Sequence, residues 1–414
     1  MELQRRLTWG LGSSDFQQRV DMGRLRADRL AKTKAALRED GIAAALFFGS
    51  RNDNTRYATA LKGVELSLVF ADDDQESIVF ARPEHCAHLQ VECPWIKPEN
   101  VRSFPIIEPQ GGLEAQDAMA AIGVAKVLEA LRDAGITEGP VAGEIPGALQ
   151  RGLEEAGVRF VPLGITMNKA REIKTDDEIN LMKMVAALAD SAWAKMIDAV
   201  RPGITDQQVA AIGTEFLVAH GAEDFRISLR TGPAGSPNWG LQTDRFMQAG
   251  DLGFGYIMGN LYMGYHACYH RTWSVGREPT AQQKSWYQRT LDWTLAAQDA
   301  IKPGLTTADV AQVFPTADVF GVANEYEVAS NAIAHGVGVG AHEIPTISRA
   351  WSIDHPQPIR VGQVIALHFW YGEHFNGGAR IENIGVVTEN GWENLFTFPY
   401  DGIVVPPQQI RTAL

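Results

Sequence analysis

Residues 198–210 read DAVRPGITDQQVA, and residues 299–311 read DAIKPGLTTADVA, at an offset of 101 positions. Seven positions are identical, and three more exchange Val for Ile, Arg for Lys and Ile for Leu. In each copy a Pro-Gly pair is predicted to end one helix, and Thr205 or Thr306 stands where the cap of the next helix belongs. Self-similarity at a fixed spacing indicates a duplicated folding unit.

A second pair of similar segments follows the two copies. Gly250-Asp251-Leu252 and Gly362-Gln363-Val364 both lead into alternating patterns that predict strands. The unit of helix, helix and β-hairpin therefore occurs twice, and two such units are expected to pair about a pseudo-twofold axis. The natural position for a site is between them, where two hairpins present side chains to one cleft.

A domain boundary is expected shortly before Thr175-Asp176-Asp177-Glu178, which is a capping box at the start of a long helix. Upstream, the pattern predicts a helix at 22–39, strands at 42–48, 66–70 and 77–80, and alternating helices and strands between 127 and 161. Residues 1–168 are thus expected to form an α/β domain, and residues 169–414 an α+β domain that holds the duplication.

Composition restricts the class of protein. The formal charge of −13 argues against nucleic-acid binding, and no window approaches the roughly 20 apolar residues of a membrane helix. The first residues lack the apolar stretch of an export signal, and the three cysteines do not suggest a disulfide framework. We therefore expect a cytoplasmic protein with a small-molecule substrate and no nucleic-acid or membrane partner.

Histidines are concentrated in the duplicated half. Eight of the ten follow residue 200, and six of these lie in three short segments. The six are His266, His270, His335, His342, His368 and His374. Imidazoles that titrate near neutrality and are brought together in this way point to proton transfer or metal binding.

The same segments resemble the pita-bread family of methionine aminopeptidases, prolidases, aminopeptidases P and creatinases. The pattern His-Gly-x-Gly-x-x-x-His-Glu-x-Pro is matched in full at 335–345, and it is flanked by Gly264-Tyr265, Arg271-Thr272 and Arg380-Ile381-Glu382. The resemblance extends to an Arg56-Tyr57 turn in the first domain. It implies a pseudo-twofold pita-bread catalytic domain after a smaller α/β domain, and a homodimer.

Metallopeptidases of that family hold two metals with two Asp, one His and two Glu. By resemblance, the corresponding positions are Ile257, Cys268, His335, His368 and Glu382. Because Ile cannot bind a cation, a two-metal peptidase is not expected. Cys268, His335, His368 and Glu382 remain candidate ligands for one Fe, Mn or Zn ion, while creatinase shows that the fold also works without metal.

The resemblance also suggests residue roles. His270, His335, His342 and Glu382 are the candidate catalytic residues; His270 stands where creatinase has a substrate-binding Glu, and Trp239 where it has its general-base His. The candidate substrate-binding residues are Trp239, Tyr265, His266, Trp370 and Arg380. Cys268 could instead be a nucleophile activated by His266 or His270, which share its face of a strand.

These residues favour a hydrolase that acts on a C–N bond of a small polar non-peptide molecule, as creatinase does. Three alternatives stay open: a lyase of the dimethylsulfoniopropionate-lyase type, a metalloenzyme that cleaves Xaa-Pro peptides, and a binding protein that keeps only the fold.

Overall fold

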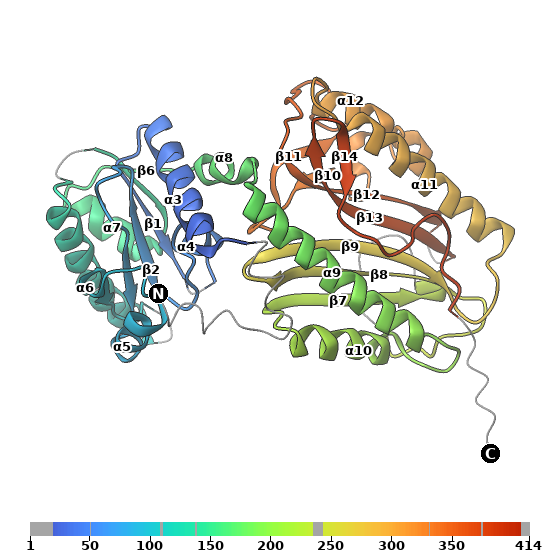
Figure 1. The fold of residues 1–414 in the computed structure, drawn as a ribbon, viewed down its shortest axis with the longest axis horizontal. Helices are drawn as coiled ribbons and strands as arrows, with labels where there is room; N and C mark the ends of the chain where they lie inside the picture. The colour runs from blue at the N-terminus through green and yellow to red at the C-terminus, as the bar shows by residue number, and fades with distance from the viewer. Residues whose placement is uncertain are drawn as a thin grey trace, which may run out of the picture. The chain divides into compact units, whose positions relative to one another are not determined.

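The computed structural model describes residues 20–49, 51–107, 111–136, 139–234, 243–330, 332–373 and 376–406. The chain divides into two compact units, Met1–Arg171 and Glu172–Leu414. Each unit has its own sheet, and Figure 1 labels most of the elements of both.

The first unit is built on a six-stranded sheet in the order β4-β3-β2-β1-β5-β6. Its strands are β1 (Ala44–Phe48), β2 (Leu66–Phe70), β3 (Ile78–Ala81), β4 (Val101–Ser103), β5 (Val141–Glu144) and β6 (Phe160–Val161). Its helices are α3 (Met22–Glu39), α4 (Asp53–Thr59), α5 (Pro83–Glu92), α6 (Leu113–Asp133), α7 (Gly147–Glu155) and α8 (Thr166–Glu172). The alternation of helices and strands predicted from the sequence is therefore confirmed, with β2 and β3 forming the expected antiparallel pair.

One local expectation for this unit is wrong. Arg56 and Tyr57 lie in helix α4 and do not form a turn. The side chain of Asn52 accepts hydrogen bonds from the backbone N–H groups of Asn54 and Thr55, which caps a new helix after β1.

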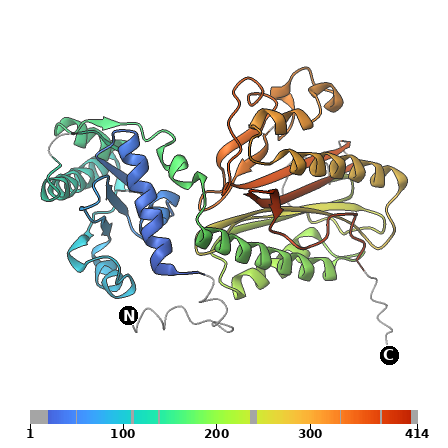
Figure 2. The same ribbon diagram turned by 45° about the horizontal axis from the view of Figure 1, so that its top comes forward.

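The second unit is built on an eight-stranded sheet, in which β11-β10-β12-β13-β9-β8-β7 are neighbours in that order and β14 pairs with β13. Its strands are β7 (Asp224–Thr231), β8 (Leu252–Tyr262), β9 (Tyr265–Ser274), β10 (Ala332–Gly336), β11 (Glu343–Ser348), β12 (Val364–Glu373), β13 (Gly377–Thr388) and β14 (Gly391–Asn394). Its helices are α9 (Asp176–Ala199), α10 (Asp206–Ala219), α11 (Ala281–Ala300) and α12 (Thr307–Val313). Figure 2 shows α9 and α11 running along this sheet, where α9 packs on β8 and β9 and α11 packs on β12 and β13.

The duplication predicted from the sequence is present in three dimensions. Thr205 caps α10 through a capping box with Gln208, and Thr306 precedes α12 with its N–H and hydroxyl donating to the Asp309 carboxylate. Thr205 also forms an isolated β-bridge with Phe246, and Thr306 forms the equivalent bridge with Pro358.

The two copies meet where β9 of the first lies beside β13 of the second. We call this line of contact the seam. The cross-strand pair at the seam is His270 and Glu382. The expectation that two hairpins present side chains to one place is thus confirmed at the level of the strands.

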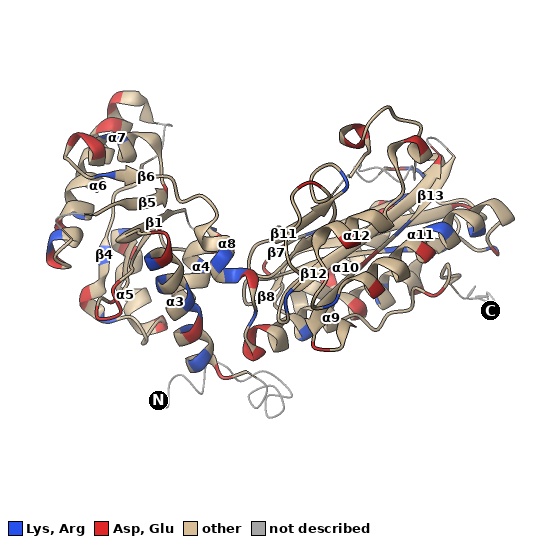
Figure 3. Cartoon of the chain, turned by 90° about the horizontal axis from the view of Figure 1, so that it is seen from above, with Lys and Arg blue, Asp and Glu red and all other residues tan. Residues whose placement is uncertain are grey.

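Charged residues lie mainly on the helices and connecting segments, while most of the strand surface in Figure 3 is uncharged. Among the helices that the structure describes, none has the length and apolar character needed to cross a membrane.

Candidate functional site

A row of five side chains crosses the eight-stranded sheet of the second unit at one level. Strand pairing places Ser228 opposite Tyr256, Tyr256 opposite His270, His270 opposite Glu382, and Glu382 opposite His368. Cross-strand partners project from the same face of a sheet, so all five lie on one face. This row passes through the seam and brings together residues that are up to 154 positions apart.

His270 and Glu382 form a buried pair at the centre of the row. The Nδ1–H of His270 donates to Oε2 of Glu382, and both side chains are almost fully buried. Burial lowers the pKa of His270 to about 4, so the imidazole is neutral at pH 7. Burial alone would raise the pKa of Glu382, but His270, His368 and His335 together outweigh it and hold that pKa below its usual range. The pair is therefore a carboxylate that orients a neutral imidazole.

His335 approaches Glu382 from β10. Its Nδ1–H donates to the carbonyl of Gly336 at 2.9 Å, which fixes the tautomer and leaves Nε2 with a lone pair. That Nε2 lies 4.0 Å from Oε1 of Glu382, the carboxylate oxygen that His270 does not use. The ring of His342 packs on His335 with 4.2 Å between centroids. Nε2 of His335 and Oε1 of Glu382, which both carry lone pairs, are thus separated by only a short gap.

Cys268 completes a cluster of potential ligand atoms. It lies two residues before His270 on β9 and therefore projects from the same face. Its Sγ, a nitrogen of His335 and an oxygen of Glu382 all lie within 4.8 Å of one another, and all three residues are buried. Burial raises the pKa of the Cys268 thiol well above its usual value, so on its own it is a protonated thiol and a poor nucleophile.

The loop between His335 and His342 is held by a buried ion pair. Lys174 Nζ lies 2.6 Å from Oε2 of Glu343, and both side chains are almost completely inaccessible. The other carboxylate oxygen of Glu343 accepts the backbone N–H of Gly340 at 2.8 Å. A Cβ at Gly338 would lie 2.8 Å from Oε2 of Glu343, so only glycine fits there without displacing the pair. The loop that carries the two histidines is therefore braced from behind.

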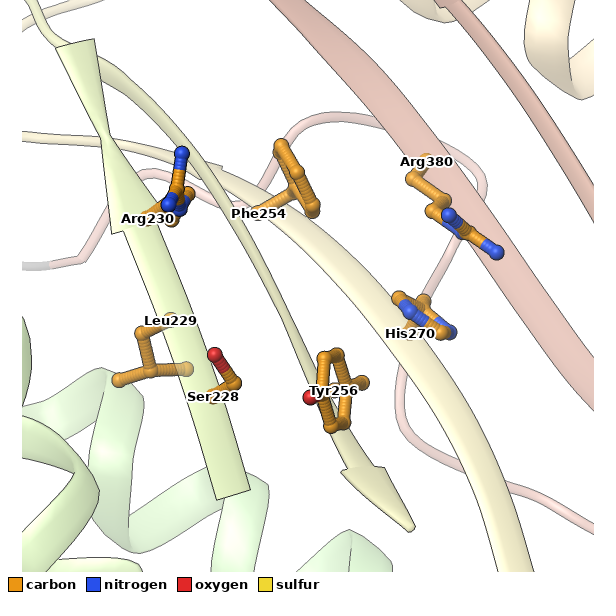
Figure 4. Close-up of a pocket in the computed structure, with 7 residues that line it drawn as sticks. All are labelled: Ser228, Leu229, Arg230, Phe254, Tyr256, His270 and Arg380. Atoms are coloured by element: carbon orange, nitrogen blue, oxygen red, sulfur yellow. The ribbon is translucent and has the colours of Figure 1, made fainter. Parts of the chain in front are cut away.

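A small cavity lies beside the row, as Figure 4 shows. It is about 10 Å³, room for one water molecule, and it is lined by Ser228, Leu229, Arg230, Phe254, Tyr256, His270 and Arg380. Arg380 is fully buried, and its Nη2 lies 3.4 Å from Nδ1 of His368. A guanidinium therefore adds a fixed positive charge next to the His270–Glu382 pair.

The structure distributes the other predicted residues differently. His266 shares the face of Cys268 and His270, whereas Tyr265 projects from the opposite face, where its hydroxyl donates to Glu178 of α9. Tyr265 therefore packs under the sheet and does not line the site. The indole N–H of Trp370 donates to the carbonyl of Ala329 at 2.9 Å, which ties this ring to the segment before β10. Trp239 and His374 lie outside the described residues.

His368 was expected among the metal ligands. It lies next to Glu382 in the row, and its ring centroid is 5.9 Å from that of His335. The cluster within 4.8 Å that is found among the described residues nevertheless contains only Cys268, His335 and Glu382, and Nδ1 of His368 lies 3.4 Å from Arg380. His368 therefore lies at the border of the cluster.

Ile257, which the resemblance places at the first metal position, lies on the face opposite the site. Ile257 pairs with Tyr269, whose hydroxyl bonds to Asp190 of α9, so both project towards the helices. Tyr256 projects towards the site instead, where its ring lies 5.2 Å from that of His270. The pairing of β8 with β9 shifts by one residue between Asn260 and Tyr262. A regular alternation counted backwards from the turn at Gly264 therefore assigns the residues of β8 to the wrong faces. The sequence places Tyr256 among the aromatic residues that crowd these segments, but it does not single it out as a site residue.

The metal pair that the resemblance implies does not fit these residues. Such a pair needs several carboxylates, and Tyr256, Cys268 and His368 now stand in the row or beside it. Glu382 is the only carboxylate in the cluster of possible ligands found among the described residues, and His270 already occupies one of its oxygens. A carboxylate-bridged pair of cations therefore lacks its ligands here.

Comparison with known proteins agrees with the fold and the motifs. The "Uncharacterized peptidase YqhT" of Bacillus subtilis is 27% identical over 359 residues, which cover 86% of this chain and 94% of that protein. The "Probable dipeptidase PepE" of Mycobacterium tuberculosis is 30% identical over 243 residues, which cover 58% of this chain and 62% of that protein. A solved structure of an Xaa-Pro dipeptidase from Bacillus anthracis superposes with a TM-score of 0.72 at 21% identity, covering 92% of this chain and 99% of that one.

The family assignment rests on the catalytic half. Residues 180–389, half of the chain, match the sequence family described as metallopeptidase family M24. This range runs from the first turn of α9 to the end of β13 and contains both copies of the duplicated unit. The chain therefore belongs to metallopeptidase family M24.

Proposed function

We propose that the chain hydrolyses the amide C–N bond of a small peptide-type substrate. The observation that carries this proposal is the buried His270–Glu382 pair beside His335, in the catalytic unit of an M24 hydrolase. Amide hydrolysis needs a group that takes a proton from the attacking water and returns one to the leaving nitrogen.

We assign that proton transfer to His270. Its Nδ1 bonds to Glu382, which orients the ring, and its low pKa would make the protonated ring a strong acid towards the leaving nitrogen. Glu382 stabilises the imidazolium formed in this way, as the carboxylate does in other carboxylate–imidazole pairs. Arg380 contributes a buried positive charge beside the pair, which favours the negative charge that develops on a tetrahedral intermediate.

Short peptides are the first substrate class to test. PepE of Mycobacterium tuberculosis, a related protein, is described as a probable dipeptidase, and the structurally similar protein from Bacillus anthracis as an Xaa-Pro dipeptidase. Dipeptides, Xaa-Pro among them, are therefore proposed ahead of larger substrates.

A non-peptide amide or amidine, as in creatinase, is the second candidate. The observation in its favour is the replaced carboxylate set, with Tyr256, Cys268 and His368 around the Glu382 row. A site with fewer carboxylates and a buried arginine suits a substrate that differs in charge from an ordinary dipeptide. A homodimer, which the resemblance to the family implies, and a cytoplasmic location, which is expected from the sequence, belong to the same proposal, and light scattering would measure the oligomeric state.

Turnover of the purified full-length protein on two panels separates these candidates. One panel holds Xaa-Pro and other dipeptides, and the other holds creatine-like amidines and small amides. Reactions run in ¹⁸O-labelled water should place the label in the product acid. We expect His270→Ala to lower kcat/KM by about 10²- to 10⁴-fold on the true substrate, as loss of a general acid–base does.

The matched control is His88→Ala, which removes an exposed imidazole on α5 of the first unit and should leave kcat/KM unchanged. Full activity of the His270→Ala variant would contradict the proposal. So would an unlabelled unsaturated acid as product, because that product indicates elimination by a lyase. If only the amidines and small amides of the second panel are cleaved, the substrate class is non-peptide amides and not peptides.

A further inference from the structure

We infer that this centre binds one thiophilic divalent cation, Zn²⁺ or Fe²⁺, through Cys268, His335 and Glu382, in place of the metal pair of M24 metallopeptidases. The three residues come from three strands, β9, β10 and β13, and converge across the seam. The site would exist whichever bond the enzyme cleaves.

The donor atoms lie close to the positions that ligands of one cation would take. Nε2 of His335 and Oε1 of Glu382 lie 4.0 Å apart, and the Gly336 carbonyl holds the His335 proton on the other ring nitrogen. Both atoms carry lone pairs, so a cation between them would be attracted to each. A tetrahedral zinc ion with bonds of about 2.0–2.2 Å holds two such atoms about 3.4 Å apart, so His335 and Glu382 would approach each other by about 0.6 Å on binding. The Gly336 carbonyl is the outer partner that metal-bound histidines commonly have.

Only one cation is compatible with the surroundings. Oε2 of Glu382 accepts the Nδ1–H of His270, so this carboxylate has a single oxygen left for a metal. Arg380, a buried guanidinium that contacts His368, lies two residues before Glu382 on β13. A second dication there would be placed against a permanent positive charge, and the ligand cluster found among the described residues offers no carboxylate besides Glu382.

The sulfur of Cys268 determines which cation is preferred. A thiolate is a soft ligand that favours zinc or ferrous iron over the hard cations Mg²⁺ and Ca²⁺. On binding, the thiol loses its proton to solvent and the sulfur becomes the third protein ligand. Three protein ligands leave a fourth position open, the arrangement found in catalytic zinc sites.

Metal analysis of the full-length protein tests this inference without an activity assay. We expect the chelator-treated protein to bind one equivalent of Co²⁺ per chain and to develop a sulfur-to-cobalt charge-transfer band in the near ultraviolet. Cys268→Ser should lose that band and bind Zn²⁺ at least about 100-fold more weakly. Loss of a residue that only supports a metal ligand already weakens binding by up to about 100-fold. Cys93→Ser should keep both properties, because Cys93 is a buried cysteine in the first unit, in a cluster of apolar residues.

X-ray absorption on the zinc-loaded wild type covers the case in which Cys268→Ser does not fold. A single sulfur neighbour at about 2.3 Å is expected. Two bound equivalents, a zinc shell of nitrogen and oxygen only, tighter binding of Mn²⁺ than of Zn²⁺, or no binding at all would each overturn the inference. None of these readouts depends on substrate. Failure of the proposed hydrolysis would therefore leave the metal inference unchanged, and failure of metal binding would leave the proposed hydrolysis unchanged.

Discussion

The tautomers and contacts of individual side chains in this site are determined by neighbouring groups. His335 is held in one tautomer by a backbone carbonyl, and Glu382 is divided between two imidazoles, one at each oxygen. His342 and His335 lie seven positions apart in one motif, yet their rings pack together at a tilt because the glycine-rich loop between them reverses direction. The motif could be recognised in the sequence, whereas the division of Glu382 between two partners could not.

The ion pair behind the histidine loop gives a prediction about stability. Replacing Lys174 by Met should cost about 3–5 kcal/mol in the free energy of unfolding, because it leaves the buried Glu343 carboxylate without its partner. Lys183→Met is the control, since its ion pair with Glu393 is about half exposed on both sides and should contribute less than about 1 kcal/mol. Urea denaturation measures both values. Equal small losses for the two variants would contradict the assigned role of Lys174.

Asp206 gives a prediction about pH. Its carboxylate is fully buried and accepts hydrogen bonds from Thr231 and Thr243, and burial raises its pKa above the ordinary value. A carboxyl group whose pKa is raised on folding stabilises the folded state below the unfolded pKa, about 3.9, and this contribution is lost as the pH rises through the folded pKa.

The stability of the wild type relative to Asp206→Asn should therefore fall as the pH is raised from about 4 towards 7. Thermal unfolding of both proteins across this range measures the difference. Asp198→Asn is the control, because Asp198 is more exposed near the end of α9. A difference between wild type and Asp206→Asn that stays constant or grows with pH would show that the carboxyl pKa is not raised.

At the scale of elements, the predictions that held depend on local chemistry. The capping boxes at α9 and α10 and the strand-turn pattern of β2 and β3 are each specified within a few residues. Two features could not be predicted in that way. Helix α4 depends on a single Asn cap in a segment that resembles a turn, and the face of Tyr256 depends on an irregularity in the hairpin. A one-residue shift in register exchanges the two faces of a strand. The residues that project towards the site therefore follow only from the observed pairing of the hairpin.

The cap of α9 gives a prediction at this scale. Thr175 accepts from the Glu178 N–H, and the Glu178 carboxylate accepts from the Thr175 N–H in return. Thr175→Ala should therefore lower the free energy of unfolding by about 1 kcal/mol, and Thr175→Ser should restore most of it. Chemical denaturation of the three proteins provides the comparison. Equal stability of the Ala and Ser variants would mean that the hydroxyl does not contribute.

At the scale of the whole molecule, the two units have separate cores. In the first unit, buried residues of the sheet pack on α6 and α7 in one cluster. In the second, the clusters that surround α11 belong to strands of the catalytic sheet. The division could be anticipated from the capping box at Thr175, because a strong helix start after a run of strands is a common place for a boundary.

A core substitution in the first unit should therefore be felt mainly within that unit. Leu46 is completely buried in β1, and Leu46→Ala should cost about 2–5 kcal/mol of stability there. Hydrogen exchange should speed up in β1, β2 and β5 while β9 and β13 keep their protection. Leu113→Ala, at a largely exposed position, is the control with no expected effect. Equal loss of protection in both sheets would show that the units unfold as one.

The meeting of β9 and β13 also determines when activity can appear during folding. His270 belongs to one copy of the duplicated unit and Glu382 to the other, so neither copy alone contains the pair. A chain with one finished half and one unfinished half would have native helices and hairpins but no working centre. Recovery of turnover after dilution from denaturant should consequently lag behind the return of helical signal, and it would time the docking of the two halves.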